Sequence, residues 1–177
     1  WSAAILDDEG VSTVGVIINP KAGRGRGKGL ALAQQLAPQT DVLVLNSFSD
    51  LYPGLQRFAQ SGLTDLFISS GDGTIQAIQT WIAESKQFKT LPRLCLLPHG
   101  TTNMTAADLG FRHKSVAAQA DFLRTLNIAD QRRRPTIRCA NPADGKPRHG
   151  MFVGTGAAAT GTKYCQDAFN AKGVKGQ

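Results

Sequence analysis

DLFISSGDGT, residues 65–74, is the stretch on which the fold of this chain depends. The apolar run predicts a buried strand, and Gly71-Asp72-Gly73-Thr74 predicts a turn into a helix. Glycine allows a sharp turn and the close approach of another molecule to the main chain. A helix amino terminus offers free N–H groups to a phosphate. Asp72 could hold a metal or accept a proton there, or merely cap the helix, and this stretch alone leaves both interpretations open.

Apolar runs alternate with segments of helical periodicity on both sides of this stretch. Strands are predicted at 13–19, 41–46, 66–68 and 93–97, and helices at 30–37, 50–61, 74–85 and 115–126. This alternation predicts βαβ units and hence a parallel sheet. Ligands bind outside the carboxyl ends of such strands, where the corners after the first, third and fourth predicted strands would meet. Three glycine-bearing corners at one edge favour a binding site over simple turns.

The corner after the first predicted strand is basic and rich in glycine, from Asn19 to Gly29. It fails the P-loop pattern, because Ala22 stands where the first glycine is needed and Gly29 follows Lys28. It also fails the dinucleotide pattern G-x-G-x-x-G. A flexible loop remains, whose backbone N–H groups could surround a phosphate. Its cationic side chains, which would add positive charge, are Lys21, Arg24 and Arg26.

Composition limits the possible partners and metals. The net charge of +7 favours anionic partners, but no basic and aromatic interleaving typical of a nucleic-acid platform is present. Cysteine and histidine spacings match neither a disulfide framework nor a zinc site, and we interpret His99 as an incidental turn residue. No apolar run is as long as a membrane span, and no secretory signal is visible.

The pattern changes at Arg134. Alternating residues at 135–140 and 150–154 flank a turn signal and predict an antiparallel hairpin, and 156–170 predicts a helix of small residues. An isolated hairpin is not stable, and nothing that follows would cover this one, so the second unit is expected to be incomplete. We therefore predict an α/β domain at 13–130 and the beginning of a truncated β-rich domain at 134–177.

Three motifs in order resemble the diacylglycerol kinase catalytic-domain family, which includes bacterial lipid kinases and sphingosine kinases and is related in fold to NAD kinases. The motifs are Asn19-Pro20-Lys21-Ala22-Gly23, Ser70-Gly71-Asp72-Gly73-Thr74, and Pro98, Gly100, Thr101 and Asn103 before Leu109-Gly110. The resemblance implies a three-layer nucleotide-binding domain with a parallel sheet. Two departures are Met104, where the family often has an acidic residue, and Ser70, where diacylglycerol kinases commonly have glycine.

The resemblance also implies roles for individual residues. Asp72 would be catalytic and would help to position Mg²⁺ or the acceptor hydroxyl. The residues implied to line ATP are Asn19, Pro20, Lys21, Ala22, Gly23, Ser47, Ser70, Gly71, Asp72, Gly73, Thr74, Ile75, Gln76, Thr101 and Asn103. A second, mainly β domain in family members completes the lipid site and supplies an acidic catalytic residue, so we expect the chain alone to be inactive.

The function implied is transfer of the γ-phosphoryl group of ATP to a lipid hydroxyl, of diacylglycerol or a sphingoid, with Mg²⁺ as cofactor. We expect a cytoplasmic enzyme of phospholipid metabolism that meets its lipid at a membrane surface. No nucleic-acid partner is expected, and the enzyme could form a homo-oligomer. Two alternatives stay open. One is an NAD kinase-like enzyme, which shares the Gly-Asp-Gly-Thr corner, and the other is a non-catalytic nucleotide-binding module.

Overall fold

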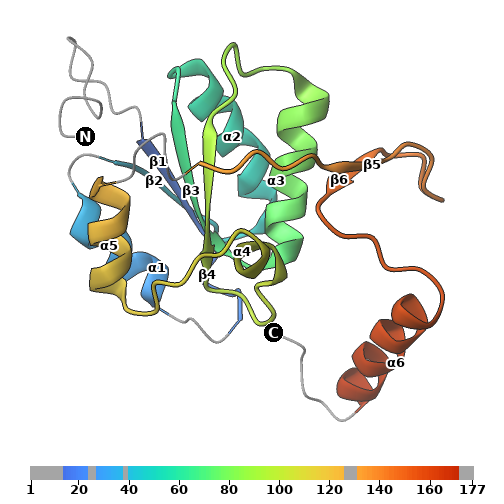
Figure 1. Cartoon of the computed structure of the whole chain (residues 1–177). Helices are drawn as coiled ribbons and strands as arrows, with labels where there is room; N and C mark the ends of the chain where they lie inside the picture. The colour runs from blue at the N-terminus through green and yellow to red at the C-terminus, as the bar shows by residue number, and fades with distance from the viewer. Residues whose placement is uncertain (1–13, 24–26, 38–39, 126–130, 172–177) are drawn as a thin grey trace.

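The protein is described by a computed structural model in which residues 14–23, 27–37, 40–125 and 131–171 are placed. A four-stranded sheet lies between two layers of helices (Figure 1). The elements in chain order are β1 (Val14–Ile18), α1 (Lys28–Leu36), β2 (Asp41–Val44), η1 (Phe48–Asp50), α2 (Leu51–Gln60), β3 (Asp65–Ser70), α3 (Asp72–Ser85), β4 (Arg93–Pro98), α4 (Met104–Asp108), α5 (Val116–Thr125), β5 (Ile137–Cys139), β6 (Arg148–Gly150) and α6 (Ala157–Ala171). The cations Arg24 and Arg26 and the expected domain boundary near 130 lie outside the described residues.

The sheet is parallel throughout, with the strand order β2-β1-β3-β4. Every residue of β1 and β3 is buried, because helices cover both faces of the central strands. Parallel strands require crossover connections, and helices supply them here, as the alternating sequence pattern predicted. The predicted α/β fold class is therefore confirmed, and the carboxyl ends of the strands meet at one edge of the sheet.

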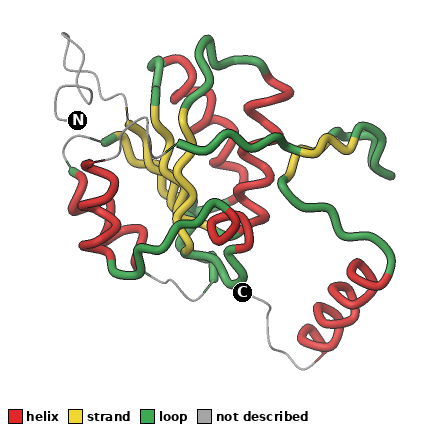
Figure 2. The backbone as a smooth tube through the Cα atoms, viewed as in Figure 1, coloured by secondary structure: helices red, strands yellow, loops and turns green. Residues whose placement is uncertain are grey.

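Helices lie on both faces of the sheet (Figure 2). An apolar core fills the space between the sheet and the helices on each face. On one face, α2 and α3 pack through Leu51, Leu55, Phe58, Ile75 and Ile78. On the other face, α1 and α5 pack through Leu32, Leu36, Ala120 and Leu123. These residues recur at helical spacing, which places them on one side of each helix. The two cores hold the sheet rigid, so that the loops at its carboxyl edge have a fixed base.

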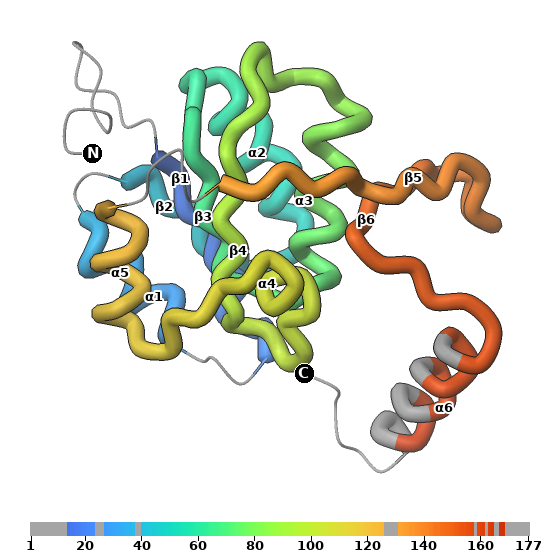
Figure 3. The backbone as a smooth tube through the Cα atoms, viewed as in Figure 1, coloured from blue at the N-terminus to red at the C-terminus, as the bar shows by residue number. Residues whose placement is uncertain are grey.

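The hairpin of β5 and β6 packs against α3, and α6 projects away from the sheet domain (Figure 3). The prediction that nothing covers this hairpin is wrong for the side that faces α3. The predicted second strand at 150–154 is also wrong, because β6 ends at Gly150. β6 begins at Arg148, two residues before the predicted start, and the backbone N–H of His149 within it donates to Thr80 Oγ1 at 2.9 Å. Phe152 and Val153 follow as exposed loop residues. The predicted helix of small residues is present as α6.

Candidate functional site

The three glycine corners come together at the carboxyl edge of the sheet. A Cβ atom on Gly23 would lie 2.3 Å from the carbonyl carbon of Gly100, and one on Gly100 would lie 2.4 Å from the Cα of Gly71. These distances leave no room for a side chain. Gly23 also has a φ of +57°, which favours glycine. The three backbones can approach this closely only because glycine stands at positions 23 and 100.

Hydrogen bonds join the first two corners directly. The backbone N–H of Asn19 donates to the carbonyl of Ser69 at 3.0 Å. The Asn19 side-chain amide donates to Thr74 Oγ1 at 3.2 Å, and its oxygen accepts from the N–H of Lys21 at 3.1 Å. Asn19 therefore shapes its own loop and also holds it against the start of α3. This explains why an asparagine, with a donor and an acceptor in one side chain, suits the position.

Asp72 joins the second corner to the third. It is the first residue of α3, yet its carboxylate accepts from the amino end of α4. The backbone N–H of Met104 donates to Oδ2 at 3.2 Å. The N–H and the hydroxyl of Thr105 donate to Oδ1 at 3.1 Å and 2.8 Å. The capping interpretation is thus partly right, but the helix that Asp72 caps is α4 and not its own.

Asn103 shapes the third corner from within. Its backbone is left-handed, with a φ of 53°, a conformation that asparagine tolerates better than most residues. Its side-chain oxygen accepts from the N–H of Gly100 at 2.6 Å, and its amide donates to the Gly100 carbonyl at 2.9 Å. Thr101 is exposed between these two residues. Asn103 therefore holds the loop that brings Gly100 against Gly71.

The remaining sequence-predicted residues differ in what they can offer. Ser47 follows β2 and forms a capping box with Asp50, whose carboxylate accepts from the Ser47 N–H at 2.8 Å. Lys21 Nζ donates to the carbonyl of Asn46 at 2.9 Å, which connects the first corner with the end of β2. Ile75 is 2% exposed and belongs to the core, so only its backbone could face a ligand.

A buried network beside the site involves residues for which the sequence predicted no role in a site. His99 Nδ1 lies 2.8 Å from Ser69 Oγ, and Nε2 lies 3.0 Å from Gln119 Oε1. The Gln119 amide donates to the carbonyl of His113 at 3.0 Å, so Oε1 must accept from His99 Nε2–H. Nδ1 then accepts the Ser69 hydroxyl. Burial lowers the pKa of His99 below its ordinary value, and the positive charge of Lys28 adds to this effect. The histidine interpreted as incidental is a neutral link between β3, β4 and α5.

The residues at the corners fit a phosphate better than they fit a metal cage. Closely packed glycine backbones and a helix amino terminus suit an anion, and Ser70 Oγ is buried with no hydrogen-bond partner among the described residues. Within the described part of the chain, no group of three or more His, Cys, Asp or Glu could hold a metal ion. Mg²⁺ needs no such cage, because one or two carboxylates and the substrate phosphates commonly hold it. Asp72 is the carboxylate that the corners offer.

Comparison with known proteins agrees with this geometry. The family model described as the diacylglycerol kinase catalytic domain matches residues 13–133. The chain belongs to this family. Among solved structures, a diacylglycerol kinase from Bacillus anthracis str. Sterne is similar, with a TM-score of 0.53 and 26% sequence identity. The match covers 63% of this chain and 39% of that chain, so this chain spans well under half of that kinase. Comparison with curated proteins gave no match.

Membership of this kinase family confirms the resemblance on which the sequence predictions were based. The matched residues include all three corners and all four strands of the parallel sheet. The roles predicted for individual residues and the presence of a second, β-rich domain stay predictions. Across the described residues, the helices are too short or too polar to cross a membrane.

Proposed function

We propose that this chain forms the nucleotide-binding part of an ATP-dependent lipid kinase, which transfers the γ-phosphoryl group of ATP to a lipid hydroxyl of diacylglycerol or a sphingoid. The observation that carries the proposal is the contact of Gly23, Gly71 and Gly100 at the amino end of α3. Phosphoryl transfer depends mainly on positioning the reacting groups and on neutralising the negative charge of the phosphates. A rigid glycine cradle at a helix terminus supports both requirements.

The proposed nucleotide contacts are the residues predicted from the sequence. Backbone N–H groups within Ser70–Gln76 would bind the phosphates. Those of Thr74 and Ile75 already donate to the carbonyl of Gly71, so the first residues of α3, Asp72 and Gly73, are the ones proposed to do so. Asn19–Gly23 would form the neighbouring wall, and Ser47, Thr101 and Asn103 would complete the pocket. Lys21 would add positive charge, although its Nζ already donates to Asn46. Shape and charge at these corners support a nucleotide phosphate as the ligand.

Asp72 is the proposed metal-binding and catalytic carboxylate. Each of its oxygens accepts hydrogen bonds from α4, and a carboxylate retains further lone pairs for a cation or a hydroxyl proton. A bound Mg²⁺ would neutralise charge on the phosphates. The hydrogen bonds from α4 would hold the carboxylate in one orientation, so that it can orient the acceptor hydroxyl.

The test is phosphoryl transfer from labelled ATP to a lipid extract by the full-length protein that contains this chain. A labelled phospholipid is expected from the wild type and not from Asp72→Asn. Thr105→Val serves as a control, because it removes one hydrogen bond to Asp72 and keeps the carboxylate. It should retain most of the activity. Labelling of NAD and no lipid would support an NAD kinase instead, and ATP binding without any transfer would support a non-catalytic module.

A further inference from the structure

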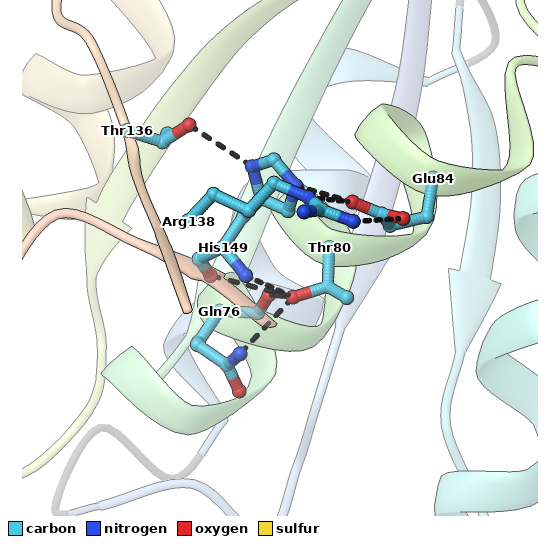
Figure 4. Close-up of polar contacts among 6 residues, drawn as sticks. All are labelled: Gln76, Thr80, Glu84, Thr136, Arg138 and His149. Carbon is cyan, nitrogen blue, oxygen red and sulfur yellow. Dashed lines mark hydrogen bonds and ion pairs between the residues drawn. The ribbon is translucent and has the colours of Figure 1, made fainter. Parts of the chain in front are cut away.

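A row of polar residues runs along α3 from the glycine corners to the β5–β6 hairpin. Asp72, Gln76, Thr80 and Glu84 are spaced four residues apart, and successive residues at this spacing are neighbours on the surface of a helix. Asp72 is the first residue of α3, and Glu84 stands one residue before its carboxyl end. The hairpin contacts the row at Thr80 and Glu84 (Figure 4). The row therefore connects the proposed phosphate site with the place where the hairpin docks.

The hydroxyl of Thr80 joins the two halves of this row. Its oxygen accepts from the backbone N–H of His149 in β6 at 2.9 Å and from the side-chain amide of Gln76 at 3.0 Å. Its proton is donated to the carbonyl of Gln76 at 2.8 Å, so the carbonyl of His149, at 3.3 Å, is not its main acceptor. A hydroxyl offers one donor and two acceptor positions. The bond to β6 and the bond to the Gln76 side chain therefore share one oxygen, and together they fill its capacity to accept.

The side chain of Gln76 is ordered by these contacts. Within the described residues, Thr80 is the one hydrogen-bond partner of its amide. β6 ends beside the stem of the same side chain, because a Cβ atom on Gly150 would lie 3.6 Å from Gln76 Cγ. Gln76 is otherwise partly exposed, and a glutamine side chain loses considerable rotamer freedom when it is fixed. Docking of the hairpin thus fixes a side chain at the amino end of α3 before any ligand arrives.

We infer that Thr80 is a positioning residue that couples docking of the β5–β6 hairpin to nucleotide binding at the amino end of α3. The inference rests on the proposed function, because Gln76 is one of the proposed nucleotide contacts. With the hairpin docked, Gln76 is already ordered, so less conformational entropy is lost when the nucleotide binds. Such coupling is reciprocal: docking tightens nucleotide binding, and a bound nucleotide stabilises docking to the same extent.

Glu84 contributes to this coupling through docking alone. Its carboxylate accepts from Arg138 at 2.7 Å and lies 2.7 Å from His149 Nε2, so it holds the hairpin from the far end of the row. It lies eight residues from Gln76, more than two turns of helix away. A change at Glu84 therefore loosens the hairpin without touching the bond between Thr80 and Gln76.

The test combines two measurements on the full-length protein that contains this chain, with ATP and Mg²⁺ and no lipid acceptor. Calorimetric titration gives the affinity for ATP, and hydrogen exchange of residues 137–150 reports docking. Thr80→Val removes the hydroxyl and keeps the shape of the side chain, whereas Thr80→Ser keeps the hydroxyl and should rescue both measurements. Thr125→Val is the matched control, because its hydroxyl also donates to the carbonyl four residues earlier, but on α5. Circular dichroism checks that each variant is folded.

Thr80→Val should weaken ATP binding about fivefold and speed exchange in the hairpin, whereas Thr80→Ser and Thr125→Val should stay within about twofold of the wild type. Glu84→Gln should weaken ATP binding as far as it loosens the hairpin. Saturating ATP should slow hairpin exchange in the wild type and do so much less in Thr80→Val, an effect that a purely structural role of Thr80 would not produce.

Two results would overturn the inference while leaving the proposed function intact. One is ATP affinity that stays at the wild-type value in Thr80→Val or in a Glu84→Gln protein whose hairpin exchanges faster. The other is hairpin exchange in the wild type that ATP does not change. Absence of ATP binding by the wild type would be a different failure, because it would refute the proposed function and the inference with it.

Discussion

The hydroxyl of Thr105 donates to Oδ1 of Asp72 at 2.8 Å, and the backbone N–H of the same residue donates to the same oxygen at 3.1 Å. The two residues belong to different glycine corners. A carboxylate at the start of α3 thus fixes the start of α4, so the proposed catalytic group also holds together the loops around it. Function and local stability are coupled at this residue, which makes the choice of control variants important.

Asp72→Asn should lower the free energy of unfolding by about 1–2 kcal/mol, because an amide carries no charge and turns a donor toward one of the N–H groups of α4. Thr105→Val removes one neutral donor and should cost about 1 kcal/mol. Thr105→Ser retains the hydroxyl and should be nearly neutral. Urea denaturation measures all three. A fully stable Asp72→Asn would mean that the three hydrogen bonds to this carboxylate contribute little to folding.

Gly100→Ala and Gly71→Ala form a matched pair of substitutions. A Cβ on Gly100 would meet the Cα of Gly71 at 2.4 Å, whereas a Cβ on Gly71 would find its nearest neighbour at 3.6 Å, an ordinary contact. Gly100→Ala should therefore destabilise the protein by about 1–3 kcal/mol, and Gly71→Ala by much less. Thermal unfolding measures the difference. If the two variants lose the same stability, the corners are not packed as closely as this structure describes.

Most of the sheet domain could be predicted from the sequence, because its signals are local. Residues 14–18 form a continuous apolar run and are buried on both faces, and the apolar positions of α2 recur with helical spacing. The sequence also predicted that the three corners converge, because parallel strands place their carboxyl ends at one edge of the sheet. Family membership is consistent with the order of the three motifs.

The contacts between corners could not be predicted, because they depend on how loops far apart in the chain approach each other. Asp72 and Thr105 are 33 residues apart, and no local pattern relates them. His99 lies in a turn where a histidine gives no signal of burial, yet it is 3% exposed. Its two partners come from β3 and α5. β6, which starts earlier than predicted, contacts Thr80 on α3 through the N–H of His149, again a contact at long range.

The docking of the β5–β6 hairpin on α3 should weaken in acid. Arg138 donates to Glu84 at 2.7 Å and 3.2 Å, and His149 Nε2 lies 2.7 Å from the same carboxylate (Figure 4). The hydrogen bond from Arg138, followed by that from His149, lowers the pKa of Glu84 from 4.5 to about 2. The charged carboxylate therefore stabilises docking fully above pH 4.5, and this contribution is lost as the pH falls toward 2.

Hydrogen exchange of residues 137–150, corrected for intrinsic rates, measures this docking. Glu84→Gln should raise exchange in the hairpin at pH 7, and it should remove most of the additional rise between pH 5 and pH 2. Asp121→Asn is the control, because it breaks the exposed pair with Arg124 on α5, away from the hairpin. An unchanged hairpin in Glu84→Gln would show that the backbone contacts with Thr80 suffice for docking.

Stability should also fall between pH 7.5 and 5.5 because of His99. Burial lowers the pKa of this side chain below its ordinary value of 6.5, so the folded protein keeps His99 neutral where the unfolded chain takes up a proton. The contribution of neutral His99 to stability is complete above pH 6.5, and it is lost as the pH falls through the lowered pKa of the folded protein. The slope attributable to one such proton is at most about 1.4 kcal/mol per pH unit.

Urea denaturation at both pH values compares the wild type with His99→Gln. The variant should be less stable at pH 7.5, since Ser69 and Gln119 lose their buried partner, but its stability should change less on acidification. The difference between the two slopes isolates His99 from the other histidines, and parallel slopes would contradict a neutral buried imidazole at this position.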